Sequence, residues 1–134
     1  MKAVFDTNVL IAAFLTEGVC SKLLTRARKG ECDLILSNDI IREFEKVLRK
    51  KFALSRQEIP DVRAILTEAT KAMIRQVSPI EPICRDGDDN KILACALAAD
   101  ADHLVTGDED LLVMKKYGKT RIISPKEFEG LFAD

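Results

Sequence analysis

The sequence predicts an α/β fold, in which a parallel sheet is covered by helices on both faces. Short apolar runs that read as buried strands occur at residues 3–5, 34–36, 104–106 and 121–123. Helical patterns separate these runs, and strands that are apolar throughout are typical of parallel sheets between two helical layers. The chain has 134 residues, a length typical of one domain, so we expect a single domain over residues 1–134.

The first strand, expected at residues 3–5, ends at Asp6. A helical pattern follows from about Val9 and another crosses residues 19–24, which we expect to end at Gly30.

After the second strand, apolar side chains recur with helical spacing at residues 40, 41, 44, 47 and 48. Ser55 and Glu58 then fit a capping box, which predicts a helix through about Gln76, although Pro60 leaves its start uncertain.

The second half of the chain continues the alternation of helix and strand. Prolines in residues 78–83 favour an extended segment. The acidic turn at residues 86–90 supplies capping oxygens to an alanine-rich helix expected at residues 91–99. The last expected strand leads into a helix that Ser124 caps and that has Pro125 as its first residue.

The composition excludes several classes of protein. With 47% hydrophobic and 32% charged residues, the chain is not disordered. Aromatic residues make up 5%, with no Trp, which argues against a base-stacking surface. Twenty-one basic residues against 22 acidic ones give a net charge of −1, so any nucleic acid must be held by local basic patches.

Nothing in the sequence predicts a zinc site, a secretory signal or a membrane span. The four cysteines form no CxxC pair, and the single histidine, His103, is expected to be structural. Asp6 and Asn8 leave only about seven apolar residues near the N-terminus, and no stretch has the 18 apolar residues of a membrane helix. We therefore expect a cytoplasmic protein with reduced thiols and no membrane contact.

Acidic residues cluster at the expected strand ends. Asp6 and Asp108 each follow a strand, Glu43 lies one turn into a helix after a strand, and Asp88 and Asp89 open the alanine-rich helix. Each could be a helix cap or a surface charge by itself. In parallel sheets, however, these ends meet at one edge, and gathered carboxylates repel unless a cation joins them. All-oxygen ligation favours Mg²⁺ or Mn²⁺.

Four segments, taken in order, resemble the PIN-domain ribonucleases. They are Asp6-Thr7-Asn8, Glu43 with its neighbours, residues 88–97 and Thr106-Gly107-Asp108. The triplet alone is weak evidence, but the four together span the chain, and they are most similar to prokaryotic PIN-domain toxins of toxin–antitoxin systems. This resemblance implies a three-layer α/β/α fold, Mg²⁺- or Mn²⁺-dependent hydrolysis of RNA, a homodimer and a cognate antitoxin protein.

The resemblance also assigns site residues. It implies that Asp6, Glu43 and Asp108 are catalytic metal ligands and that Asp89 supplies the acid of the third motif. Many PIN proteins carry that acid where this sequence has Asn90, so either Asp89 replaces it or the metal binds more weakly. Additional candidate ligands are Asp88, Asn90 and Asp110. Thr106 either orients Asp108 or simply fills its strand end.

Other readings remain open at this level. A PIN scaffold that binds RNA or a partner without cleavage is the main alternative, supported by Asn90 and the near-neutral charge. A receiver domain needs paired acids after its first strand, and a haloacid-dehalogenase-like phosphatase needs Asp-x-Asp-x-Thr there, where this chain has Asp6-Thr7-Asn8.

Two further patterns have both a functional and a structural interpretation. The basic runs contact phosphate or are solvated helix ends; they are residues 42–51 with a local charge of +3, the group Lys115, Lys116, Lys119 and Arg121, and the group Arg26, Arg28 and Lys29. An apolar helix face is either a dimer surface or ordinary core; it comprises Ile65, Leu66, Ala69, Met73 and Ile74.

Overall fold

The computed structural model describes residues 1–132 and contains a six-stranded sheet in the order β3-β2-β1-β4-β6-β5. The strands are β1 (Lys2–Phe5), β2 (Asp33–Ser37), β3 (Thr70–Ile74), β4 (His103–Val105), β5 (Lys116–Tyr117) and β6 (Thr120–Ile123). All neighbours pair in parallel except β5, which runs antiparallel to β6. The predicted parallel sheet is confirmed.

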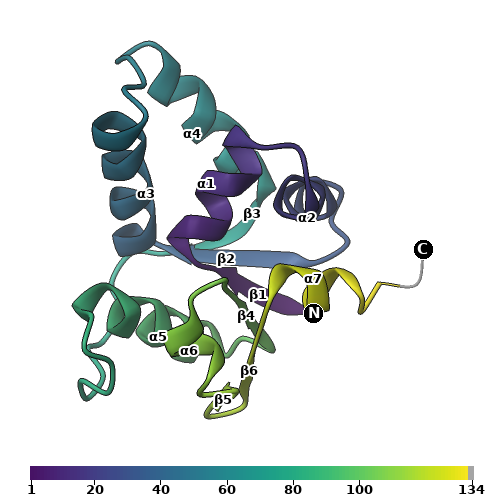
Figure 1. The fold of residues 1–134 in the computed structure, drawn as a ribbon, viewed down its shortest axis with the longest axis vertical. Helices are drawn as coiled ribbons and strands as arrows, with labels where there is room; N and C mark the ends of the chain where they lie inside the picture. The colour runs from purple at the N-terminus through teal and green to yellow at the C-terminus, as the bar shows by residue number, and fades with distance from the viewer. Residues whose placement is uncertain (133–134) are drawn as a thin grey trace.

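Helices flank this sheet on both sides: in Figure 1, α5 and α6 lie to the left of its lower strands, whereas α2 and α7 lie to its right. The helices are α1 (Thr7–Leu15), α2 (Val19–Arg28), α3 (Asn38–Lys51), α4 (Glu58–Ala69), α5 (Gly87–Ala99), α6 (Glu109–Leu112) and α7 (Pro125–Glu129). Helix α3 starts at the carboxyl end of β2 and packs beside α1. The predicted α/β/α layering is therefore confirmed.

Aromatic contacts fix the helices to the sheet. Phe5 of β1 meets Phe128 of α7 edge-on, with 6.0 Å between the ring centroids. Phe14 of α1 lies 5.5 Å from Phe44 of α3. His103 packs against Phe128 at 5.5 Å, in keeping with its expected structural role. These contacts hold α7 against β1 and β4, and α1 against α3.

The helix predicted to run through Gln76 is wrong in its second part. Ser55 and Glu58 do exchange the two capping hydrogen bonds, at 3.2 and 3.1 Å, but α4 ends at Ala69 and Thr70 begins β3. Lys71, Ala72 and Met73 favour helix by propensity, and parallel pairing with β2 overrides that preference.

The expected apolar helix face is consequently divided between two elements. Leu66 and Ala69 are buried on α4, whereas Met73 and Ile74 lie on the edge strand β3, where Met73 is exposed. The interpretation of these residues as one helix face for dimerisation is therefore wrong, because the backbone changes from helix to strand between Ala69 and Thr70.

The sequence pattern missed two small elements after the fourth strand. Helix α6 follows Asp108, and β5 forms a hairpin with β6 through Gly118, which has a φ of 59° that favours glycine. Their brevity hides the usual helical or alternating periodicity.

No single helix within residues 1–132 is both long and apolar enough to cross a membrane. Only α1 and α2 taken together reach that length and composition, and they meet at 96°.

Candidate active site

Three carboxylates from separate segments meet at the carboxyl edge of the sheet. Asp6 follows β1, Asp108 follows β4 and Asp89 lies in the first turn of α5. Parallel pairing of Phe5 with Val105 aligns the ends of β1 and β4, and the Asp6 N–H donates to the Val105 carbonyl at 3.1 Å. The predicted convergence of these three acids on one sheet edge is therefore found. We call Asp6, Asp89 and Asp108 the acidic cluster.

Thr106 connects two members of the acidic cluster. Its hydroxyl is fully buried and donates a hydrogen bond to Asp6 Oδ2. The hydroxyl oxygen of Thr106 also accepts the backbone N–H of Asp108 at 3.0 Å. The other carboxylate oxygen of Asp6 accepts the Val9 N–H at 3.0 Å, so Asp6 also caps α1. Thr106 thus holds the Asp6 side chain and the Asp108 backbone in a fixed relation.

The electrostatics of the acidic cluster disfavour ionisation. Burial raises the pKa of Asp89 to about 6, with further increases from the charges of Asp108, Asp86 and Asp6. Burial is also the main cause that raises the pKa of Asp6, and the charge of Asp108 adds to it, against the hydrogen bonds from Thr106 and Val9. Within residues 1–132, no ion pair joins a basic side chain to the cluster.

Glu43 lies beside the acidic cluster. It is half-buried on α3 and lines a narrow hollow of about 20 Å³ together with Thr7 and Asp88. The charges that raise the pKa values in the cluster come from aspartates, and Glu43 is not among them. The described structure therefore brings Glu43 near Asp88 but does not place it in the cluster.

The other candidate ligands have different positions. Asp88 is exposed and lies 3.9 Å from Lys91 Nζ. Asp110 is exposed on α6, and its N–H donates to Asp108 Oδ1 at 2.9 Å. Asn90 turns to the preceding loop: its Oδ1 accepts the Cys84 N–H at 3.0 Å and its Nδ2 donates to the Cys84 carbonyl at 3.1 Å. The Asn90 amide is thus occupied in holding that loop.

Asp86 and Asp39 contribute to this region, although the sequence pattern did not single out either one as a site residue. Asp86 caps α5 by accepting the Asp88 N–H at 2.9 Å, so α5 begins at Gly87, four residues before the predicted start. Asp39 lies in the first turn of α3 and lines the hollow that Glu43 also lines. Its place two residues after a buried strand is a signal that could have identified it.

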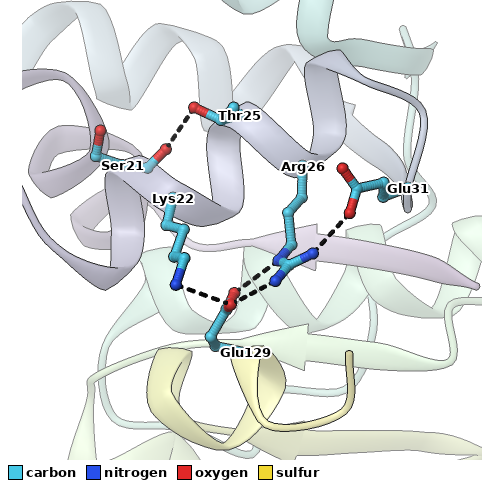
Figure 2. A network of polar contacts seen from close by, with 6 residues as sticks. All are labelled: Ser21, Lys22, Thr25, Arg26, Glu31 and Glu129. Atoms are coloured by element: carbon cyan, nitrogen blue, oxygen red, sulfur yellow. Dashed lines mark hydrogen bonds and ion pairs between the residues drawn. The ribbon is translucent and has the colours of Figure 1, made fainter. Parts of the chain in front are cut away.

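One of the predicted basic groups is an internal support. Figure 2 shows Arg26 of α2 between Glu129 and Glu31, with Nη2–Oε1 and Nη1–Oε1 distances of 2.6 Å to each. Its guanidinium also lies 4.3 Å from the ring centroid of Phe132. Arg26 is only 5% exposed, so neither interpretation of its group, phosphate contact or a solvated helix end, holds for this residue. Lys22 approaches the same Glu129 at 3.6 Å.

The residues of the acidic cluster have the donor chemistry that hard divalent cations require. They offer carboxylate oxygens in a setting where burial, and then like charge, raises the pKa values of Asp6 and Asp89, and no basic side chain within residues 1–132 forms an ion pair with them. Within residues 1–132, however, no three Asp, Glu, His or Cys side chains are arranged so as to enclose an ion. The cluster fits a hard divalent cation in charge and donor type, but its described residues form no preformed ligand cage.

Comparison with known proteins yields one family. The family model for the PIN domain matches residues 2–110, which include the acidic cluster, Glu43 and Thr106. PIN domains are generally nucleases, and they typically use divalent metal ions. No curated protein matches the chain.

Proposed function

Because this chain belongs to the PIN-domain family, we propose that it is a metal-dependent endoribonuclease that hydrolyses RNA phosphodiester bonds. The observation that supports this proposal most directly is the acidic cluster, whose buried carboxylates lack a basic partner within residues 1–132. A bound cation would relieve the repulsion between these carboxylates, and it would attract the phosphate of the substrate.

Asp6, Asp89 and Asp108 would hold Mg²⁺ or Mn²⁺ in this proposal. When bound, such a cation would lower the pKa of a coordinated water and would stabilise the leaving oxyanion. Val9 and Thr106 fix both carboxylate oxygens of Asp6 by hydrogen bonds, so its orientation costs little when substrate arrives. The Asp89 carboxylate lies next to Asp108, and its pKa of about 6 suits it to take a proton from the attacking water.

We include Glu43 in the proposed ligand set, although it lies outside the acidic cluster. It lines a hollow with Thr7 and Asp88, the chain neighbours of Asp6 and Asp89, and its carboxylate would add negative charge at the rim of the site. We assign Asp88, Asn90 and Asp110 no direct role, since Asn90 holds the Cys84 loop and the two aspartates are exposed.

Cleavage of a mixed pool of structured and unstructured RNA tests the proposal. Wild type, Asp6→Asn and the control Asp110→Asn are each assayed with Mg²⁺, Mn²⁺ or EDTA. We expect cleavage by wild type and Asp110→Asn with metal only, and a loss of at least about 100-fold in Asp6→Asn. Circular dichroism of each variant verifies folding. Metal-independent cleavage, or full activity of Asp6→Asn, would contradict the proposal.

A second candidate is a PIN scaffold that binds RNA without cutting it. The observation in its favour is that no three candidate ligands within residues 1–132 enclose an ion. RNA binding by folded wild type without cleavage under either metal would favour this scaffold.

We further propose that the protein is the toxin of a toxin–antitoxin pair, cytoplasmic and homodimeric. The order of its four motif segments over a short chain supports this reading. Induced expression should arrest growth, and co-expression of the protein encoded next to it should restore growth. Arrest that persists in Asp6→Asn would separate toxicity from cleavage.

A further inference from the structure

A groove leads away from the acidic cluster between α3, α5 and the segment 75–80 that follows β3. It consists of three adjoining hollows, all lined by Asp39, of which the first two are also lined by Lys91. We call it the α3–α5 groove. Its first hollow is the narrow one at Thr7 and Glu43 described above, so the groove begins at the proposed site of cleavage.

The middle hollow of the groove has a volume of about 220 Å³ and a mainly apolar lining, which Asp39, Asn90 and Lys91 complete. Its lining includes Val77, Pro79, Ile80 and Ala94. Water occupies about 30 Å³ per molecule in the liquid, so this hollow has room for several waters or one flat ring. An apolar recess next to a charged site suits a nucleobase better than it suits a phosphate.

The far hollow is wider, at about 520 Å³, and basic. Arg42 and Arg75 line it from two different elements, and Asn38 Nδ2 donates to the Arg75 carbonyl at 3.1 Å, which ties the two elements together. Arg42 lies 3.5 Å from Asp39 in an exposed ion pair that a phosphate can replace at little cost. Within residues 1–132, Arg75 forms no ion pair.

Beyond the acidic end, the groove therefore has three basic side chains, Arg42, Arg75 and Lys91, against one acid, Asp39. The chain as a whole has a net charge of −1, so this local excess is a property of the groove. Basic side chains spaced along an apolar recess match the alternation of phosphates and bases in a single strand.

We propose that single-stranded RNA lies along the α3–α5 groove, with one base in the apolar hollow and backbone phosphates on Arg42 and Arg75. This inference rests on the proposed ribonuclease function and adds where the substrate binds and in which form. A duplex is excluded because its paired and stacked bases are not free to enter the recess.

The basic end of the groove is tested by RNA binding. A labelled 12-nucleotide single strand of random sequence is titrated against Asp6→Asn protein with Mg²⁺ at several salt concentrations. The double variant Arg42→Gln/Arg75→Gln, the groove pair, is compared with the double variant Arg49→Gln/Lys50→Gln, the control pair. The control pair also removes two positive charges, but at the far end of α3, about 12 Å along the helix from Arg42.

We expect the groove pair to raise Kd about tenfold and to reduce the slope of log K against log salt by about 1.4. The control pair should change Kd by less than about threefold. Equal effects of the two pairs on Kd would overturn the assignment of the groove as the RNA-binding site. Duplex RNA that binds as tightly as the single strand, with the same dependence on Arg42 and Arg75, would overturn the single-strand assignment.

The apolar hollow is tested by sequence preference. Ile80→Ala is made in the catalytically active protein, and its cleavage of a randomised RNA pool is compared with that of the control Ile83→Ala. The Ile83 side chain is exposed and does not line the hollow. We expect Ile80→Ala alone to alter the base preference at one position next to the cut. Identical preferences in wild type and both variants would overturn the base site.

These outcomes separate the two proposals. If wild type cleaves RNA and the groove variants behave like their controls, the groove assignment fails and the ribonuclease stands. If folded wild type neither binds nor cleaves any RNA, the ribonuclease proposal fails, and the groove assignment fails with it.

Discussion

Asp89 is a buried aspartate in the first turn of α5, and its pKa of about 6 is the clearest sign of strain in the acidic cluster. Its ordinary pKa is 3.8, so at neutral pH the folded protein holds a charge that the unfolded chain holds more easily. The difference corresponds to at most about 3 kcal/mol of unfolding free energy.

Asp89→Asn should therefore stabilise the metal-free protein. Because the folded pKa is the higher one, wild type loses stability from this group as pH rises from about 4 through 6, whereas the variant does not. In EDTA, we expect the advantage of the variant to grow over that window and to level off above about pH 7. Urea unfolding from about pH 4 to about pH 8 measures it, and parallel pH profiles of the two proteins would contradict the assignment.

Thr106 permits a second test at single-residue scale. Thr106→Val keeps the shape but removes the donor to Asp6 and the acceptor for the Asp108 N–H. We expect a loss of about 1–3 kcal/mol in stability and a fall in RNA cleavage, with Thr106→Ser restoring both. Urea unfolding and the RNA assay provide the two readouts.

Thr120→Val is the matched control for that variant. Thr120 is equally buried and donates to the Ala101 carbonyl at 2.7 Å, away from the acidic cluster. It should lose comparable stability and keep its cleavage rate. Equal losses of cleavage in both variants would mean that Thr106 acts only through the fold.

At the scale of elements, Arg26 joins α2 to α7. The guanidinium donates twice to Glu129, at 2.8 Å from Nε and 2.6 Å from Nη2, and this hydrogen bonding lowers the pKa of Glu129 (Figure 2). The same helix α7 carries Phe128, which packs on Phe5 of the central strand. The network therefore holds the last helix against the sheet.

We expect Arg26→Ala to cost about 3 kcal/mol, because it leaves Glu129 without its main partner in a half-buried position. Arg28→Ala is the control: its exposed pair with Glu68, at 3.4 Å, should contribute less than about 1 kcal/mol. Urea unfolding of both variants distinguishes them. Similar small losses would show that the Arg26 network adds no net stability.

The elements also show where sequence patterns are informative. The strand runs, the amphipathic pattern of α3 and the capping signals at Ser55 and Ser124 are local, and each is found in the structure. Residues 70–74 had no such local signal, because their strand exists only through pairing with β2. The extent of α4 was therefore not predictable from its own residues.

At the scale of the whole molecule, metal binding should raise stability. A cation that binds only the folded state at 100 times its Kd adds about 2.7 kcal/mol, and it relieves the repulsion in the acidic cluster besides. We expect Mg²⁺ or Mn²⁺ to raise the Tm of wild type and of Asp110→Asn by several degrees. The Tm of the double variant Asp89→Asn/Asp108→Asn should rise much less. Calorimetry measures this, and a Tm independent of either metal would contradict the proposed ligand set.

The sequence alone determined the fold class, the position of the acids at strand ends and the family likeness, because periodicity, capping and motif order are properties of local residues. Only the tertiary structure decided which acids meet. Parallel register brought Asp6 beside Thr106 and the Asp108 backbone, and the start of α5 turned Asp89 into the cluster and Asn90 toward Cys84. Adjacent residues on a helix point about 100° apart, so the choice between positions 89 and 90 depends on how α5 packs against the sheet.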